Sequence, residues 1–369
     1  MRPSVLHVVE SLERGAVENW LLRMLGRAQA RGMKLDWTFY CALGEEGTKA
    51  TEARALGARV IASPVAIGDK LEFVRALRAE TRQGYDVLHC HHDLVSAVYL
   101  VAAVGVPLRR RIVHVHNADE QVLTPSTFKQ WLYREPMRSL CLSLADRIVG
   151  ISKHTLRTFL AGRAPREDRD VVRYYGIDPL SFARPFDRAA FRRKLGLPDA
   201  APLLLFAGRM VPEKNPRFVV DVARALKELD PTTAAVFVGD GPLAREVRDY
   251  ARGDAVHFFG WRGDVADFMR ASDLFILPHV EHALEGLGIA VVEAQLADLP
   301  LLLSKGVADD PLLSTARYES RPLGEGAKAW ARAAKRLLAS KSTGSAIDAL
   351  ARSPFDMDRA LDGLLELYA

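Results

Sequence analysis

The chain has 369 residues, of which 49% are hydrophobic and 26% are charged, a composition typical of soluble globular proteins. This length exceeds what one ordinary core accommodates and predicts two domains of about 180 residues each. The three cysteines, Cys41, Cys90 and Cys141, are scattered without a Cys-x-x-Cys spacing. Their distribution argues for a reducing compartment and against a structural zinc site.

The apolar segments are too short for targeting or for crossing a membrane. Near the N-terminus the apolar run is Val5 to Val9, which is shorter than the core of a signal peptide. The longest weakly polar stretch, Leu94 to Leu108, is shorter than a bilayer span, and we expect a buried helix there. We therefore predict a cytoplasmic protein.

Short buried-strand patterns alternate with helical patterns in both halves of the chain. In the first half they lie at Val5–Val9, Trp37–Cys41, Val60–Ala62, Val87–His89 and Ile112–Val115, with a short one within 145–151. In the second half they lie at Leu203–Ala207, Ala234–Val238, Val256–Phe259, Leu274–Leu277 and Leu301–Ser304. This alternation predicts an α/β protein with two doubly wound, Rossmann-like parallel sheets that face each other across a cleft.

The connection between the two halves is expected within residues 173–202. This segment contains four prolines and a charged stretch, which favour loops over a continuing sheet. We therefore predict an N-terminal domain over residues 1–183 and a C-terminal domain over 184–354. The remaining segment, 355–369, places its apolar residues roughly on one helical stripe and is expected to be a helix.

Positive charge is concentrated in the first half of the chain. Residues 1–185 carry 27 Lys+Arg against 20 Asp+Glu, whereas the rest carries 24 against 26. The excess includes Arg109–Arg111 and the segment 129–140, where basic residues mix with aromatic and aliphatic ones. Such a segment suits a helix at a lipid surface, and the alternative is a helix packed on the core with a solvated basic edge. Nucleic acid is the weakest interpretation, because no binding module is recognisable.

Histidines gather in the predicted strands of the first half, at His7, His89, His91, His92, His114 and His116. The cluster around Cys90 resembles a metal site on paper. Strand alternation, however, puts His89 and His91 on one face and Cys90 and His92 on the other. We therefore predict no metal site, and structural roles for His7 and His114.

A loop with two cations follows the first strand of the second half. Gly208, Arg209 and Lys214 come after Leu203–Ala207, and a helical pattern begins after Pro216. Loops at the carboxyl ends of parallel strands are where α/β sheets bind ligands. Arginine suits bidentate phosphate contacts and lysine supplies a point charge, so the pair suits a diphosphate. The alternative is that both are solvated loop residues.

Two glutamates eight residues apart, Glu285 and Glu293 in LEGLGIAVVEAQ, enclose a glycine turn and the start of an apolar run. This pattern predicts one carboxylate on a loop, a turn of backbone amides and a second carboxylate early in a helix. Amides at a helix start bind anions, and carboxylates accept hydrogen bonds from sugar hydroxyls. The combination suits a phosphorylated sugar such as a nucleotide sugar. The alternative is an ordinary helix start, whose dipole favours acidic residues.

These motifs resemble a known family. In the second half they are FAGRMVPEKN (206–215), VGDGPL (238–243), FFGWRGDV (258–265), SDLFILP (272–278) and EGLGIAVVEA (285–294). In order, they resemble the C-terminal half of retaining glycosyltransferases of the GT-B fold, specifically glycosyltransferase family 4. In the first half, VLHVVESLERGAVENWLLRML (5–25), GYDVLHCHH (84–92) and IVHVHNADE (112–120) resemble the family's first strand, glycine loop and following strands. The resemblance covers nearly the whole chain.

The resemblance implies an acceptor-side first domain, on which helix 355–369 packs, and a nucleotide-sugar-binding second domain. It implies that His116 is the acceptor-site histidine and contacts the donor sugar or the developing charge near the reacting centre; the alternative is a hydrogen-bonded structural residue. It also implies that Gly15 lies beside the donor phosphates, followed by the family's acidic residue at Glu18. The chain departs from the family here, because Arg14 replaces the first of two glycines. Enzymes of this fold generally need no bound metal.

For the reaction, the resemblance implies that Arg209 and Lys214 neutralise the diphosphate leaving group. Glu285 is then the residue that holds sugar hydroxyls, and Glu293 accepts hydrogen bonds from the ribose. The acceptor hydroxyl attacks from the face that the leaving group vacates, which retains the anomeric configuration without a covalent intermediate.

The remaining donor contacts follow from the same resemblance. The backbone amides of Gly286, Leu287 and Gly288 are expected to assist at the diphosphate. The base is expected to lie against residues 258–265 and the turn at 240–242, with Arg262 as a contact.

The substrates are expected from the branch that the chain most resembles. ERGAVEN, HVHN and LSKGVADDPLL (303–313) look most like enzymes that build capsular and exopolysaccharide repeat units. That branch implies a UDP-hexose or UDP-N-acetylhexosamine as co-substrate, with GDP-mannose second and no bound cofactor. The basic first half suggests a polyprenyl-diphosphate-linked saccharide acceptor at the inner face of the cytoplasmic membrane.

Two other interpretations stay open. A GT-B nucleotide-sugar epimerase would bind UDP similarly but act without an acceptor, and its motifs are not evident. A biosynthesis scaffold would keep the fold without turnover, but the intact set of Arg209, Lys214, Glu285 and Glu293 argues against it. A nicotinamide enzyme is disfavoured, because no dinucleotide-binding glycine motif follows the first strand.

Overall fold

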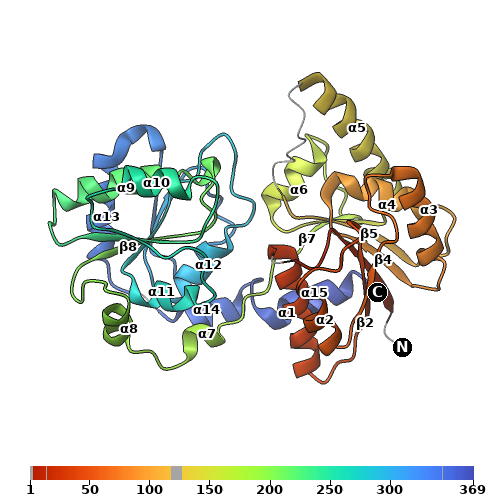
Figure 1. Cartoon of the computed structure of the whole chain (residues 1–369), viewed down its shortest axis with the longest axis horizontal. Helices are drawn as coiled ribbons and strands as arrows, with labels where there is room; N and C mark the ends of the chain where they lie inside the picture. Colours follow the sequence, from red (N-terminus) through yellow and green to blue (C-terminus); the bar gives the residue numbers. More distant parts are fainter. Residues whose placement is uncertain (1–2, 14, 118–126, 343) are drawn as a thin grey trace. The chain divides into compact units, whose positions relative to one another are not determined.

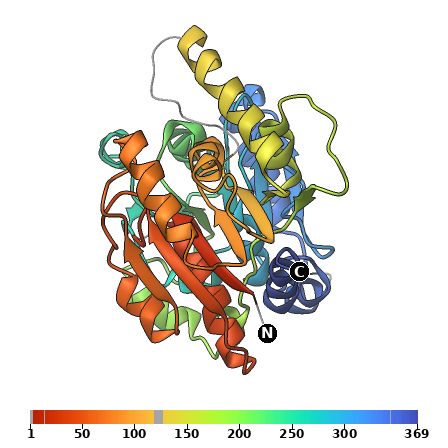
Figure 2. The same cartoon turned by 90° about the vertical axis from the view of Figure 1, so that its right-hand side faces the viewer.

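The structure is a computed structural model that describes residues 3–13, 15–117, 127–342 and 344–369, with the backbone alone over 127–132. The chain forms two compact units (Figures 1 and 2). Unit 1 comprises Met1–Gly176 and Pro354–Ala369, and unit 2 comprises Ile177–Ser353. The boundary therefore comes after residue 176, earlier than the predicted 183, and the final helix belongs to unit 1.

Unit 1 contains a seven-stranded parallel sheet in the order β3-β2-β1-β4-β5-β6-β7. The strands are β1 Ser4–Val9, β2 Asp36–Cys41, β3 Arg59–Ala62, β4 Val87–Cys90, β5 Arg110–Val115, β6 Arg147–Gly150 and β7 Asp170–Val172. The helices are α1 Ala16–Ala30, α2 Ala50–Ala55, α3 Lys70–Thr81, the 3₁₀ turn η1 Asp93–Val95, α4 Ser96–Ala102, α5 Thr127–Leu144, α6 Lys153–Leu160 and α15 Met357–Glu366. The sheet is doubly wound, with helices on both faces (Figure 1).

The two faces of the unit 1 sheet are packed differently because side chains alternate along each strand. On one face, Leu6 and Val8 join a buried apolar cluster with residues of α3, α4 and α6. On the other face, His7 and the histidines of β4 and β5 lie against aromatic residues such as Trp20 of α1 and Tyr368 of the C-terminal segment.

Unit 2 contains a six-stranded parallel sheet in the order β10-β9-β8-β11-β12-β13. The strands are β8 Leu203–Ala207, β9 Ala234–Val238, β10 Val256–Phe258, β11 Leu274–Leu277, β12 Leu301–Ser304 and β13 Tyr318–Arg321. The helices are α7 Leu180–Ala183, α8 Arg188–Lys194, η2 Pro212–Lys214, α9 Pro216–Lys227, α10 Ala244–Tyr250, α11 Val265–Ala271, α12 Ile289–Leu296, η3 Leu323–Glu325, α13 Gly326–Leu338 and α14 Ala346–Arg352.

The central strands of unit 2 are fully buried, as their continuous apolar sequences require. Residue 215 adopts a left-handed conformation that ends η2, and Pro216 then occupies the first turn of α9, where its missing N–H costs nothing. The apolar stripe of α9 is buried, and the helix packs against α13. The β8–α9 connection that carries Arg209 and Lys214 is thus fixed at both ends.

Two segments differ from the expectations in their local structure. The predicted connection 173–202 contains α7 and α8, and Arg192 of α8 is buried where it binds Asp273. The helix expected within 94–108 is confined to η1 and α4, because glycine and proline interrupt the segment at Gly105 and Pro107.

The basic segment 129–140 lies in α5. Arg138 is buried and donates from Nε to the Phe159 carbonyl at 2.7 Å, and Cys141 is buried in the apolar cluster. The second half of α5 is therefore packed on the core, while the side chains before residue 133 lie outside the described residues. In the described part of the chain, no helix is long and apolar enough to cross a membrane.

Candidate active site

The loops after β8 and β9 of unit 2 lie against each other through glycine backbones. Gly208 and Gly239 have φ values of 154° and 130°, where side chains are strained. A Cβ on Gly239 would lie 2.0 Å from the carbonyl oxygen of Gly208. The Met210 N–H also donates to the Asp240 carbonyl at 2.8 Å. These contacts fix the backbone from which Arg209 projects.

The side chain of Arg209 is exposed, and within the described part of the chain its guanidinium has no hydrogen-bond or ion-pair partner. This arginine is therefore available to a ligand, and the alternative of a solvated loop residue stays open. The predicted partner cation, Lys214, is instead engaged. Its Nζ lies 3.2 Å from Oε2 of Glu285, and the two side chains are only 21% and 15% exposed.

A third group, His279, completes this cluster. Its Nε2 lies 3.6 Å from the same Oε2 of Glu285, and its side chain is 6% exposed. Its Nδ1 lies 3.1 Å from the carbonyl oxygen of Val280, which favours an Nδ1–H that donates to this carbonyl. His279 was not predicted from the sequence, because nothing in HVEHALE distinguishes it from the nearby His282.

The loop that carries Glu285 is held between the loops after β8 and β12. The Glu285 N–H donates to the Gly306 carbonyl at 2.9 Å, and the Val280 N–H donates to the Glu213 carbonyl at 2.7 Å. A Cβ on Gly306 would lie 2.3 Å from the Val280 oxygen, so glycine is needed there. The carboxylate of Glu285 is therefore placed by backbone contacts from both neighbouring loops.

The predicted turn between the glutamates has the expected local form. Gly288 has φ 67° and precedes the first residue of α12, and Leu287 is buried. Gly286 is partly buried on the turn, and Glu293 lies in the second turn of α12, partly exposed. Glu285 and Glu293 thus lie on either side of the helix start.

Arg262, predicted to contact the base, forms a two-point ion pair with Asp264. Its Nε and terminal nitrogen donate to the two carboxylate oxygens at 2.8 and 2.7 Å. This hydrogen bonding lowers the pKa of Asp264 and raises that of Arg262. A base contact from Arg262 stays a prediction.

At the carboxyl edge of the unit 1 sheet, Gly15 is the residue before α1. A Cβ on it would lie 2.0 Å from Oε2 of Glu18, so the glycine leaves room for that carboxylate. Burial raises the pKa of Glu18. Arg14, which replaces the family's first glycine, lies outside the described residues.

His116 ends the β5 segment, and its ring is 8% exposed. Its Nε2 lies 3.1 Å from Nδ1 of His91, and its Nδ1 lies 2.6 Å from the Tyr175 hydroxyl. Burial lowers the pKa of His116 to about 3, which keeps the imidazole neutral. Both ring nitrogens are thus occupied within unit 1, so in this conformation the ring has neither a free nitrogen nor a charge for a ligand. The predicted catalytic contact stays a prediction.

Two groups of three buried histidines have ring nitrogens within 4.8 Å of one another: His7, His89 and His91, and His91, His114 and His116. Side chains alternate along a strand, so His89 and His91 share one face of the sheet, as predicted from the sequence. His114 and His116 share a face for the same reason. The sequence does not reveal that neighbouring strands bring all five together. The expectation of no metal is not tested by the structure.

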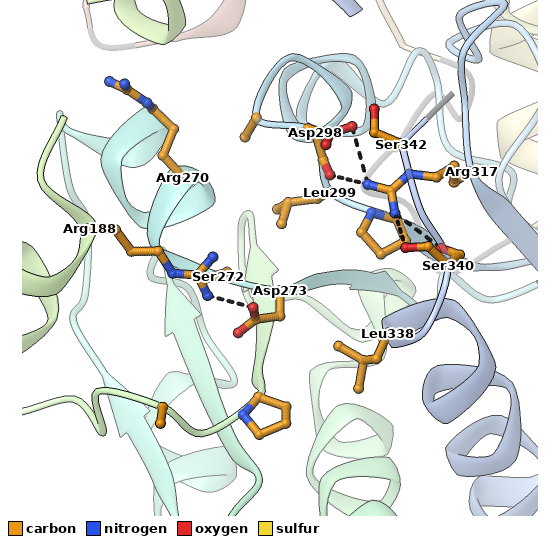
Figure 3. A pocket seen from close by; sticks show the side chains of 14 residues that line it. Arg188, Arg270, Ser272, Asp273, Asp298, Leu299, Arg317, Leu338, Ser340 and Ser342 are labelled. Atoms are coloured by element: carbon orange, nitrogen blue, oxygen red, sulfur yellow. Dashed lines mark hydrogen bonds and ion pairs between the residues drawn. The ribbon is translucent and has the colours of Figure 1, made fainter. Parts of the chain in front are cut away.

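A polar pocket of about 420 Å³ lies elsewhere in unit 2, beside the residues that precede β8, β11 and β12 (Figure 3). Its three arginines are already engaged: Arg188 pairs with Asp273 at 2.5 Å, Arg317 pairs with Asp298 at 3.2 Å, and Arg270 donates to the Arg184 carbonyl at 2.6 Å. It lies at the amino ends of these strands, the opposite edge from Arg209 and Glu285. We therefore place the candidate active site at the carboxyl edge.

Comparison with known proteins identifies the family. Residues 2–175 match the family described as "glycosyl transferase 4-like domain", and residues 187–309 match "glycosyl transferases group 1". The structure is similar to that of Anabaena Alr3699/HepE solved in complex with UDP, with a TM-score of 0.77 and 20% identity over 98% of each chain. The chain belongs to the GT-B glycosyltransferases. The predicted family and fold class are confirmed.

Curated relatives of this GT-B glycosyltransferase agree. It is 28% identical to the putative glycosyltransferase EpsF of Bacillus subtilis, over 99% of this chain and 96% of the relative. It is 26% identical to the UDP-Gal:alpha-D-GlcNAc-diphosphoundecaprenol alpha-1,3-galactosyltransferase of Escherichia coli, over 64% of this chain and 62% of that one.

Proposed function

We propose that this GT-B glycosyltransferase is a retaining enzyme that transfers a hexose or N-acetylhexosamine from a UDP-sugar. The acceptor is a saccharide on a polyprenyl diphosphate, in the synthesis of a cell-surface polysaccharide. The observation that carries the proposal is the carboxyl edge of unit 2. There Arg209, which is exposed and has no side-chain partner among the described residues, lies five residues before Lys214, which is paired with the partly buried Glu285.

The donor diphosphate is assigned to Arg209 and Lys214. As the glycosidic bond breaks, negative charge grows on the leaving phosphate, and two fixed cations lower the energy of that state. Arg209 offers a planar fork for two phosphate oxygens, and Lys214 offers a point charge. With these cations in place, a bound metal is not required for the leaving group.

Glu285 is assigned to the transferred sugar. Its carboxylate is held by its ion pair with Lys214 and its loop by backbone contacts, so it can accept hydrogen bonds from sugar hydroxyls without reorganising. Its negative charge also favours positive charge developing on the sugar ring. The acceptor hydroxyl then attacks on the face that the diphosphate leaves, and the configuration is retained.

The nucleoside is assigned to α12 and the neighbouring turns. Glu293 accepts hydrogen bonds from the ribose hydroxyls, and the amides of Gly286, Leu287 and Gly288 assist at the phosphates. Arg262 is the proposed contact for the uracil base. Gly15 of unit 1 is proposed to lie beside the phosphates, and His116 to act near the reacting centre.

Two similarities support the choice of substrates. Anabaena HepE has been solved with UDP and with UDP-glucose. The name of the E. coli relative gives UDP-galactose as donor and a diphosphoundecaprenol-linked sugar as acceptor. The excess positive charge of residues 1–185 suits an anionic lipid-linked acceptor at the inner face of the cytoplasmic membrane.

The first test is calorimetric titration of the purified chain with UDP, GDP and ADP, without added metal. We expect UDP to bind and Glu293→Ala to weaken this binding about tenfold or more. Tight binding of GDP alone would replace the donor by a GDP-sugar such as GDP-mannose. No binding of any nucleotide by the intact chain would contradict the proposal and favour a scaffold.

The second test separates transferase from epimerase. The UDP-sugar that binds is supplied with a polyprenyl-diphosphate-linked saccharide or with a soluble glycoside, and the anomeric configuration of the product is read by NMR. We expect transfer with retention to the lipid-linked acceptor. Isomerisation of the donor without acceptor would indicate an epimerase, and full activity on the soluble glycoside alone would exclude the lipid-linked acceptor.

A further inference from the structure

Five histidines lie buried together on one face of the unit 1 sheet: His7, His89, His91, His114 and His116. Burial lowers the pKa of each ring, so all five are neutral near pH 7. A neutral imidazole has one N–H and one bare nitrogen. Each hydrogen bond between two rings therefore decides which nitrogen of each ring carries the proton.

The rings form two separate hydrogen-bonded chains. In the first, which we call the Tyr175 chain, the Tyr175 hydroxyl lies 2.6 Å from Nδ1 of His116. Nε2 of His116 lies 3.1 Å from Nδ1 of His91, and Nε2 of His91 lies 3.0 Å from Nδ1 of His7. The chain ends at Nε2 of His7, which is buried and has no hydrogen-bond partner among the described residues.

The second chain, which we call the Tyr368 chain, has the same construction. The Tyr368 hydroxyl lies 2.9 Å from Nδ1 of His89, and Nε2 of His89 lies 3.1 Å from Nδ1 of His114. It ends at Nε2 of His114, which is also buried and unpartnered in the part of the chain that is described. Each chain thus runs from a buried tyrosine through Nδ1 and Nε2 of successive rings.

The tyrosines set the direction of both chains. A phenol is a better proton donor than a neutral imidazole, and the bare ring nitrogen is a better acceptor than a phenol oxygen. Tyr175 therefore donates to Nδ1 of His116, which places the proton of every ring in this chain on Nε2. The ring of His7, which carries the last N–H, lies against Trp37, with ring centroids 4.3 Å apart. The electron-rich face of an aromatic ring is a weak acceptor for such a group.

We propose that Tyr175 is a positioning residue for the transfer reaction, which acts through His116 by fixing the protons of the Tyr175 chain and the end of β5. His116 is held from both sides: its ring by Tyr175 and His91, and its backbone N–H by Oδ1 of Asp93 at 2.7 Å. Asn117 Nδ2 donates to the other oxygen of Asp93 at 2.7 Å. His116 and Asn117 are therefore anchored by hydrogen bonds where the resemblance expects the donor sugar.

Tyr175 is itself firmly placed. It is 3% exposed and stacks on Trp20 of α1 with ring centroids 4.9 Å apart. At the next residue, Gly176, a Cβ would lie 2.9 Å from atoms of Met24 and Met357, so a side chain there would require these methionines to shift. The chain passes into unit 2 directly afterwards. The consequence for turnover rests on the proposed function, whereas the two hydrogen-bonded chains do not.

A metal ion at these histidines is the competing explanation. It needs lone pairs that converge on one point, whereas here the in-plane ring nitrogens point at one another in pairs. A dication held only by neutral ring nitrogens is also costly to bury. The experiment therefore includes zinc as a separate arm.

The test uses the full chain labelled with ¹⁵N-histidine, in which long-range proton–nitrogen NMR distinguishes protonated from bare ring nitrogens. We expect Nε2–H in all five rings. Tyr175→Phe should shift the ring nitrogens of His116, His91 and His7, with those of His89 and His114 unchanged, because polarisation passes along hydrogen bonds. The matched control, Tyr368→Phe, should do the reverse.

Several results would overturn the proposal. They are a Tyr175→Phe effect confined to His116, a His7 ring protonated on Nδ1, or a stoichiometric response of both histidine groups to Zn²⁺. In the transfer assay, Tyr175→Phe should lower kcat about fivefold, the equivalent of one hydrogen bond, with the donor KM within about twofold. Tyr368→Phe should change kcat by less than about twofold. An unchanged kcat for Tyr175→Phe would remove the positioning role, and a wild type without transfer would instead refute the proposed function.

Discussion

The carboxyl edges of the two sheets carry opposite kinds of polar group. In unit 2, Arg209 is exposed and unpartnered within the described residues, and Lys214 forms an ion pair with Glu285. In unit 1, five histidines (His7, His89, His91, His114 and His116) are buried, neutral and hydrogen-bonded in two chains, whereas His92 at the same edge pairs with Glu10 at 2.7 Å. Under the proposed function, the charge for a ligand would therefore come from unit 2, while the five histidines of unit 1 would supply a neutral, hydrogen-bonded framework.

The largest expected effect tests the charged edge. Arg209→Ala combined with Lys214→Ala should lower turnover more than about 100-fold, because each lost contact to the developing charge is worth about 2–4 kcal/mol. Turnover is measured with saturating donor by product formation. The matched control is Arg188→Ala combined with Arg317→Ala at the pocket of Figure 3, which should keep turnover within about threefold. Near-normal turnover in the first pair would remove both cations from the mechanism.

The second effect tests whether the buried histidines of unit 1 stay neutral in the folded chain when the pH is lowered. Burial lowers the pKa of His7 and His116 to about 3, so below pH 6.5 the unfolded chain binds protons that the folded chain excludes. Stability is therefore full above pH 6.5 and falls as the pH drops toward 3. At pH 5.5 these two rings alone should lower the free energy of unfolding by about 3 kcal/mol.

This loss is measured by urea unfolding of the chain at pH 7.5 and 5.5, followed by the fluorescence of Trp20 and Trp37 in a variant whose other three tryptophans are phenylalanine. We expect the transition of unit 1 to move to lower urea at pH 5.5. An unchanged midpoint would mean that the histidines remain accessible to protons in the folded state.

The third effect separates nucleotide affinity from turnover. Glu293→Ala should weaken UDP binding about tenfold or more, because a hydrogen bond to a charged group contributes about 1.5–3 kcal/mol. Glu293→Gln keeps the size and one acceptor oxygen, and should lose less. If calorimetry gives both variants the affinity of the wild type, Glu293 does not contact the nucleotide.

The contrast between the edges also explains what could be predicted from sequence. The central strands of unit 2 are continuous apolar runs, and β8, β9, β11 and β12 begin and end at the predicted residues. The short edge strands β7 and β13 were missed, because sequences such as YESR (318–321) are polar and have no apolar run.

The residues of the candidate site also fall into those that the sequence predicted and those that it did not. Arg209, Lys214 and Glu285 lie in motifs with glycine and strand context, so their shared edge followed from the topology of a parallel sheet. His279 and Tyr175 lack such context. Tyr175 contacts a segment distant in sequence, with 2.6 Å between its hydroxyl and His116, and the contact of His279 with Glu285 depends on how their shared loop folds. Periodicity along one segment carries no information on those contacts.

The smallest expected effect concerns Arg262. This residue is charged like Arg209, but its side chain is already paired. Its guanidinium is held by both oxygens of Asp264. If it contacts the base, Arg262→Ala should raise the donor KM about threefold and leave kcat unchanged, since an exposed polar contact contributes about 0–1 kcal/mol. Asp264→Asn, which weakens the ion pair but keeps the arginine, should then lower the donor KM or leave it unchanged. A rise in KM for Asp264→Asn as large as that for Arg262→Ala would show that the pair shapes its loop and that the arginine does not bind the base.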